Sequence, residues 1–108
     1  HLTNSLAISQ EIGNKAGEGA TLNNIATIYH AQGDYTTALT YLTNSLAISQ
    51  EIGDKAGEGN TLFNIGLTYY KTGKKQQGLV YLQFAKKIAQ EIDDFALNQA
   101  LDDLLFDV

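Results

Sequence analysis

A segment of 17 residues occurs twice in this chain with a single difference. Residues 3–19 read TNSLAISQEIGNKAGEG and residues 43–59 read TNSLAISQEIGDKAGEG, so the second copy lies 40 positions after the first. Asn14 in the first copy corresponds to Asp54 in the second. A fixed period of about 40 residues is typical of a protein built from stacked repeats, each of which contacts only its neighbours. The repetition therefore predicts an array that presents a surface, rather than a fold built around one chemical site.

Each period contains two helical patterns. Apolar residues first recur at the i, i+3, i+4, i+7 spacing of one helical face, at Leu22, Ile25, Ala26 and Tyr29 and again at Leu62, Ile65, Gly66 and Tyr69. A second amphipathic pattern starts after Gly33 and Gly73. We therefore predict one array over residues 1–108. It consists of half a repeat at 1–13, full repeats at 14–53 and 54–93, and a capping helix at 94–108.

Local signals mark the helix boundaries. Gly33 and Gly73 suit the left-handed position that ends the first helix of each repeat, and Gly13 and Gly53 suit the end of the second. The residues after them are N-cap types, namely Asn14, Asp34 and Asp54, whereas Lys74 predicts a weaker cap. Glycines also fall in the first turns of each repeat, where they are unfavourable. Either the first helix begins late, near residue 20, or small residues are needed for close packing at Gly17, Gly19, Gly57 and Gly59.

The two ends of the array differ. Residues 94–108 place leucines at helical spacing behind Asp94, a candidate N-cap, and we expect Asp102, Asp103 and Asp107 to face outward from Leu97, Leu101, Leu104 and Leu105. Residues 1–13 form half a repeat without its partner helix and would expose an apolar stripe. We therefore expect either that the chain is an excerpt of a longer array or that it forms a homo-oligomer.

Composition excludes several classes of function. Residues 1–108 contain no run of about 18 apolar residues, which predicts no membrane span. The absence of cysteine excludes disulfides and thiolate metal sites, and the cytoplasm is the default location. Only His1 and His30 are present, without a second histidine at ligand spacing, so we expect neither a metal nor a cofactor. We expect His30 to be an exposed groove residue rather than a catalytic base, and the chain not to be an enzyme.

Charge is unevenly distributed. The net charge is −5, yet residues 71–92 carry five lysines against one glutamate, and residues 93–108 carry five aspartates. A basic segment can bind nucleic acid, but no arginine is present for bidentate phosphate contacts. We favour a solvated helix face that pairs with the acidic tail over a nucleic-acid site.

The motif residues resemble the tetratricopeptide repeat, or TPR, family. The spacing of Leu22, Ile25, Ala26, Tyr29, Gly33-Asp34-Tyr35 and Ala38 matches its signature of a large apolar residue, then Leu-Gly, Tyr and Ala. The second copy departs from it at Gly78, where the family has Ala, and Gln50 and Gln90 replace the usual proline. The 40-residue period is similar to the long variety found in Pins-type and in bacterial and archaeal signalling proteins. The resemblance implies an all-α fold, a right-handed superhelix of antiparallel helix pairs, or αα solenoid.

The resemblance also implies where a ligand binds. In the family the first helix of each repeat lines a concave groove that binds an extended or helical peptide. Carried over by position, the peptide-binding residues are Asn23, Asn24, Thr27, His30, Phe63, Asn64, Leu67, Tyr70 and Lys71. Asn24 and Asn64 occupy matching positions, where an amide can both donate to and accept from a peptide unit. Alternatively, these amides bond within their own helices or to water.

The expected groove has a distinct chemistry. Some family members hold a C-terminal carboxylate with several lysines and arginines, but only Lys71 lies near this groove, at its edge. Phe63, Leu67 and Tyr70 instead indicate an apolar spot beside amides, unless their side chains pack against the next helix. We predict a scaffold or adaptor that binds a peptide or protein partner. The alternative is a regulatory sensor module of a larger signalling protein.

Overall fold

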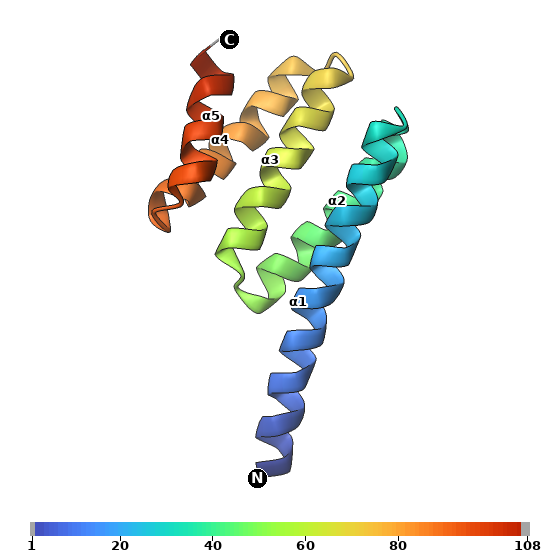
Figure 1. Cartoon of the computed structure of the whole chain (residues 1–108), viewed down its shortest axis with the longest axis vertical. Coiled ribbons are helices and arrows are strands. Elements are labelled where there is room, and N and C mark those ends of the chain that lie inside the picture. The colour runs from blue at the N-terminus through green and yellow to red at the C-terminus, as the bar shows by residue number, and fades with distance from the viewer. Residues whose placement is uncertain (1, 107–108) are drawn as a thin grey trace.

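The computed structural model describes the backbone of residues 2–106 and the side chains of residues 14–105. The described backbone consists of helices joined by short turns and contains no strand: α1 (Leu2–Ala31), α2 (Tyr35–Ile52), α3 (Lys55–Lys71), α4 (Lys75–Glu91) and α5 (Phe95–Phe106). The all-α prediction is confirmed. Figure 1 shows α1 and α2 as one antiparallel pair and α3 and α4 as the next, with α5 packed on α4.

Packing follows chain order. The contacts are most extensive within the pairs α1–α2 and α3–α4, and smaller between α2 and α3 and between α4 and α5. The apolar core is correspondingly divided into two clusters of buried side chains. One joins the first pair to α3 through Ala26, Ala38, Leu42 and Ile65, and the other joins the second pair to α5 through Leu62, Leu82, Ala85, Ile88, Ala89, Leu97 and Leu101. Contact of each helix pair with the next pair is the architecture of a helical-repeat solenoid.

The predicted turns between the paired helices are confirmed. Gly33 and Gly73 have φ of 83° and 85°, in the left-handed region that glycine adopts without a Cβ penalty. Asp34 caps α2, since its side chain accepts a hydrogen bond from the backbone N–H of Thr37 at 3.2 Å. Lys74 occupies the same place before α4 and makes no side-chain cap bond. The second copy of the turn is therefore the weaker one.

One predicted turn is wrong. We expected the helix that contains residues 1–13 to end at Gly13 and Asn14 to cap the next one, but α1 is continuous from Leu2 to Ala31. The matching residues of the second copy do form a turn, where Gly53 has φ of 71° and Asp54 accepts from the Gly57 N–H at 2.9 Å. The carboxylate of Asp54 is favourable at a helix N-terminus, whereas the neutral amide of Asn14 brings no charge. The predicted boundary between residues 13 and 14 thus lies inside a helix.

The glycines in the first turns have different surroundings. Because α3 begins at Lys55, the reading in which the first helix starts near residue 20 is wrong. A Cβ at Gly59 would lie 3.1 Å from the Ile88 side chain, so close packing explains this glycine. A Cβ at Gly17 would have no neighbour within 4 Å, so packing does not explain that one.

Helix α5 covers the end of the second pair. Asp94 caps it by accepting from the Leu97 N–H at 3.1 Å. Leu97 and Leu101 are buried and Leu104 and Leu105 are half-buried, whereas Asp102 and Asp103 are exposed; Asp107 lies outside the described residues. Lys86 of α4 forms an ion pair with Asp102, so the basic segment and the acidic tail meet at this point.

Candidate functional site

Four of the nine predicted binding residues line one cavity. It has a volume of about 160 Å³, lies between α1 and α3 above α2, and is lined by Ala26, Thr27, His30, Leu42, Asn64, Leu67 and Thr68. We call it the α1–α3 cavity. α1 and α3 are the first helices of two consecutive repeats, and they contact each other only over a short length. Both pack against α2, and the cavity is the space left between them. Thr27 and His30 enter from α1, and Asn64 and Leu67 enter from α3.

An amide bridge joins the two helices beside this cavity. The Asn64 side-chain N–H donates to the Asn23 side-chain oxygen at 2.9 Å. Both side chains are half-buried, whereas Asn24, which occupies the repeat position of Asn64, is exposed. The equivalence of Asn24 and Asn64 in sequence is therefore not an equivalence in environment. The alternative that these amides bond within their own helices or to water does not describe Asn64, which bonds to the neighbouring helix.

His30 is not the exposed residue that the sequence predicted. Its side chain is half-buried, its ring meets the Tyr35 ring edge-on at 5.0 Å between centroids, and its Nε2 atom is buried with no hydrogen-bond partner. Burial, and secondarily the positive charge of Lys71, lower the pKa of His30 below its ordinary value of 6.5. The His30 side chain thus lines the cavity, while its Nε2 atom is enclosed by protein.

The remaining predicted residues lie around the cavity or elsewhere. Lys71 is exposed at the end of α3, close enough to His30 to influence its pKa. Phe63 packs against the core cluster that contains Leu97 and Leu101, which favours the packing interpretation of its ring. Tyr70 is half-buried, with the Lys75 Nζ 5.6 Å from its ring centroid. The structure does not bring Asn24, Phe63 or Tyr70 into the α1–α3 cavity.

Sequence reasoning missed three residues that line the cavity. Ala26 was predicted only as part of an apolar helix face, and both Ala26 and Leu42 are buried. Thr68 is completely buried, and its hydroxyl donates to the backbone oxygen of Asn64 at 2.8 Å. Its spacing of four residues from Asn64 is the available signal, because residues at i and i+4 share a helix face.

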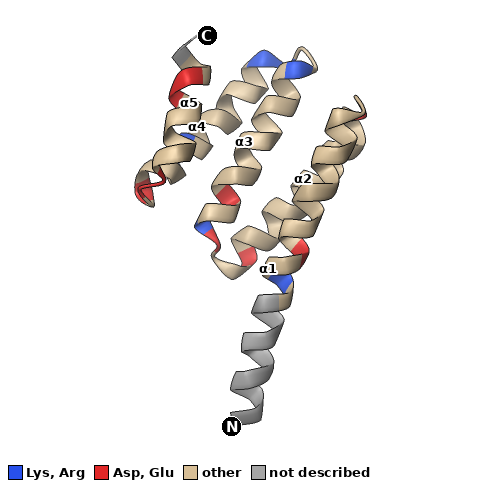
Figure 2. Ribbon diagram, in the orientation of Figure 1, with Lys and Arg blue, Asp and Glu red and all other residues tan. Residues whose placement is uncertain are grey.

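The face of α1 and α3 is uncharged along most of its length. No Asp, Glu, Lys or Arg lies between Glu18 and Asp34, or between Glu58 and Lys71. Figure 2 shows the same pattern, with charged residues at the ends of α3 and none on its middle turns. Such a face offers amide, hydroxyl and apolar groups to a ligand, and it lacks the cations that would hold a carboxylate.

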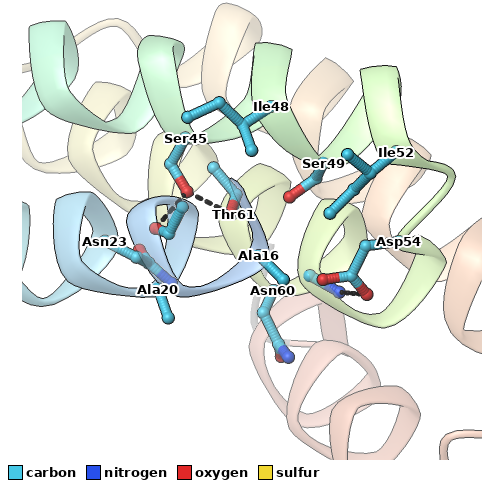
Figure 3. Close-up of a pocket in the computed structure, with 12 residues that line it drawn as sticks. Ala16, Ala20, Asn23, Ser45, Ile48, Ser49, Ile52, Asp54, Asn60 and Thr61 are labelled. Carbon is cyan, nitrogen blue, oxygen red and sulfur yellow. Dashed lines mark hydrogen bonds between the residues drawn. The ribbon is translucent and has the colours of Figure 1, made fainter. Parts of the chain in front are cut away.

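A second, more polar cavity of about 180 Å³ lies where α2 meets the N-terminal part of α3 and the middle of α1 (Figure 3). Its wall includes the Ser45 hydroxyl, which donates to the Gly19 backbone oxygen at 2.8 Å and lies 3.4 Å from the Thr61 hydroxyl. Ser45 and Thr61 are almost completely buried, so these bonds satisfy polar groups within the stack. This cavity belongs to the packing of consecutive repeats.

Other kinds of site find little support in the part of the chain that the structure describes. No three histidine, aspartate or glutamate side chains there gather in a way that could hold a metal ion. None of the described helices is both long enough and apolar enough to cross a membrane. The lysines of residues 71–92 are divided between the α3–α4 turn, where Lys74 lies over the Tyr69 ring, and the C-terminal half of α4.

Comparison with known proteins agrees with this architecture. A family model described as tetratricopeptide repeat matches residues 17–91, which is more than half of the chain and includes both helix pairs apart from the first part of α1. A search of curated proteins found no match for the chain. Tetratricopeptide repeats generally mediate protein–protein interactions and are typically non-enzymatic scaffolds. With its paired helices, its glycine turns and the matched segment, the chain belongs to the tetratricopeptide repeat family.

Proposed function

We propose that this chain is an interaction module that binds an uncharged stretch of a partner peptide on the face formed by α1 and α3. One observation supports this more than any other. Thr27, His30, Asn64 and Leu67, four residues assigned to the groove by their repeat positions, line the same cavity. The family's general role in protein–protein interaction supports a protein ligand over a small substrate.

The chemistry of the cavity suggests how the peptide is held. Leu67 and Ala26 offer apolar surface for one small aliphatic side chain, consistent with a volume of about 160 Å³. Thr27 and Asn64 add a hydroxyl and an amide to the lining, and the backbone of a peptide supplies both donors and acceptors.

The absence of charge on this face selects the ligand further. A peptide with a carboxylate at the cavity would lose water without gaining a cation, apart from Lys71 at the edge. We therefore expect peptides with a small aliphatic residue flanked by neutral residues to bind best, and acidic C-termini to give no advantage.

The test is a screen of peptides against the folded chain, followed by a matched pair of substitutions. Thr27→Arg places a long cation at the cavity, and Thr43→Arg places the same group on α2. The two threonines are equivalent locally, because both are exposed and each hydroxyl donates to the backbone oxygen four residues earlier. We expect Thr27→Arg to weaken the dissociation constant by about tenfold or more and Thr43→Arg to leave it unchanged.

The outcome also tests the asparagines. Asn64→Ala removes the amide bridge to Asn23, and Asn24→Ala changes an exposed amide at the matching position. If Asn64→Ala weakens peptide binding and Asn24→Ala does not, the peptide contacts the cavity. Equal binding by the parent chain, Thr27→Arg and both asparagine variants would overturn the proposed site.

A further inference from the structure

The identical segments of this chain lie in different surroundings. Residues 43–53, in the second half of α2, cover one face of α3: the Ser45 hydroxyl lies 3.4 Å from the Thr61 hydroxyl, and Leu46 packs against the cluster that contains Leu62. Figure 3 shows Ser45 and Ser49 directed toward this part of α3. We call the face of α3 that residues 43–53 cover the α3 stacking face. It comprises Gly57, Thr61, Leu62 and Ile65.

The corresponding face of α1 is open. Thr61 is 1% exposed, whereas Thr21 at the same repeat position is exposed. A Cβ at Gly57 would lie 3.0 Å from the Ser49 hydroxyl, whereas a Cβ at Gly17 would meet nothing within 4 Å.

The difference continues along the helix. Leu62 and Ile65 are buried, and their counterparts Leu22 and Ile25 are half-buried. At the far end Thr68 is completely buried, whereas Ile28 at the same position is 58% exposed. We call this row of α1, comprising Gly17, Thr21, Leu22, Ile25 and Ile28, the α1 stacking face.

The chain carries the sequence that fits this open face. Residues 3–13 are identical to residues 43–53, the segment that covers the α3 stacking face. They cannot cover the α1 stacking face of their own chain in this conformation, because α1 is one continuous helix and a straight helix cannot fold onto itself. A second copy of the chain has no such restriction.

We propose that two copies of this chain form a dimer by exchanging residues 3–13, each segment covering the α1 stacking face of the other copy. In the observed turn, residues 43–52 and α3 run in opposite directions. Two continuous α1 helices packed antiparallel reproduce this arrangement twice, related by a two-fold axis. The hinge is at residues 13–15, which correspond to the turn at Gly53–Lys55. This inference is independent of the peptide-binding proposal.

A proline at the hinge tests the exchange. Lys15→Pro removes a hydrogen bond from the continuous helix but is tolerated at the first position of a helix that begins after a turn. The residue before a proline favours an extended conformation, and Asp54, the counterpart of Asn14, has φ of −80° and ψ of 88°. We expect the parent chain to dimerise and Lys15→Pro to raise the dimer dissociation constant by about a hundredfold, measured by light scattering over a concentration series.

Two controls accompany this variant. Lys55→Pro places proline at the matching position of the turn that already exists, and we expect it to leave the dimer unchanged. Lys15→Ala removes the ion pair between Lys15 and Glu51 without breaking the helix, and we expect it to dimerise as the parent does. A parent chain that has the 11.7 kDa monomer mass at all concentrations would overturn the proposal.

Cysteine pairs test the register of the exchange. The chain has no cysteine, so Ser5→Cys with Thr21→Cys introduces the only thiols. Because Ser45 and Thr61 have hydroxyls 3.4 Å apart, oxidation should link Ser5→Cys of one copy to Thr21→Cys of another and give a covalent dimer. The Ser45→Cys and Thr61→Cys pair should link within one chain. A link within one chain for the first pair, or no link in a solution that light scattering shows to be dimeric, would contradict the proposed contact.

Discussion

The side-chain amide of Asn64 donates a hydrogen bond of 2.9 Å to the side-chain oxygen of Asn23, and this bond joins α3 to α1 beside the cavity. The two bonded residues do not occupy the same repeat position, because the position of Asn64 corresponds to Asn24. The bond fixes the relative position of two helices that otherwise meet over a short length, and so it contributes to the shape of the proposed binding face.

Removing this amide bridge should reduce stability. We expect Asn64→Ala to lower the free energy of unfolding by about 1 kcal/mol, because the half-buried oxygen of Asn23 loses its partner. Asn24→Ala, at the exposed matching position, should change it by less than about 0.5 kcal/mol. Urea denaturation followed by circular dichroism measures both values. Equal losses for the two variants would show that the bridge contributes nothing specific.

The effect of a glycine-to-alanine substitution on stability should depend on the space around the glycine. A Cβ at Gly78 would lie 2.7 Å from the Gly66 backbone oxygen, so Gly78→Ala must separate α3 from α4 and should cost about 1–3 kcal/mol. The first repeat has Ala26 and Ala38 at the positions of Gly66 and Gly78. Gly17→Ala has open space and should instead stabilise α1 by about 0.5–1 kcal/mol. Thermal unfolding of the two variants should therefore shift in opposite directions.

Acidification should destabilise the fold through His30. Its pKa in the folded chain is lowered below 6.5, by burial first and by Lys71 second. As the pH falls below 6.5, the unfolded chain binds protons more readily than the folded chain, so the free energy of unfolding decreases. We expect His30→Gln to lose less stability than the parent between about pH 7 and pH 5.

Two measurements check this assignment. Denaturation at each pH gives the free energy of unfolding of the parent and of His30→Gln. Both chains contain the same carboxylates, so the difference between the two values reports on His30. Nuclear magnetic resonance titration of His30 in Lys71→Met should show a pKa higher than in the parent, because a repulsive charge has been removed. An unchanged pKa would assign the shift to burial alone.

A new cap should stabilise the second repeat. Lys74 precedes α4 without a side-chain cap bond, whereas Asp34 accepts from the Thr37 N–H at the same place before α2. We expect Lys74→Asp to raise the free energy of unfolding by about 0.5–1 kcal/mol, after the loss of the contact between Lys74 and the Tyr69 ring. Asp34→Lys should have the opposite effect. Chemical denaturation of both variants measures the difference, and a destabilised Lys74→Asp would show that the ring contact matters more.

Most of the fold could be predicted because its determinants are local. The turns at Gly33 and Gly73 need a residue that accepts positive φ, and the caps at Asp34, Asp54 and Asp94 need a side chain that reaches a nearby N–H. Each requirement is visible within a few residues of sequence. The positions of Leu97 and Leu101 in the final helix likewise follow from helical spacing alone.

The failures have causes outside the local sequence. Residues 3–19 and 43–59 differ at one position, yet only the second copy forms a turn, so local propensity could not distinguish them. The bridge between Asn23 and Asn64 depends on the distance between α1 and α3. That distance is set by packing, and the family resemblance that assigned Thr27 and Leu67 to the groove gives no information about it.

The near-identity of the two segments has a consequence for how the native register is selected during folding. Side chains on α3 cannot distinguish residues 43–53 from residues 3–13, since the two sequences are the same. What differs is the loop that must close: residues 43–53 reach α3 through the turn at Gly53–Asp54, whereas residues 3–13 would have to span the residues between 13 and 55. Closing a longer loop costs more chain entropy. Connectivity, rather than complementarity, therefore selects the native pairing, and cleavage of the backbone between Gly53 and Asp54 would let the two segments compete for α3 on more equal terms.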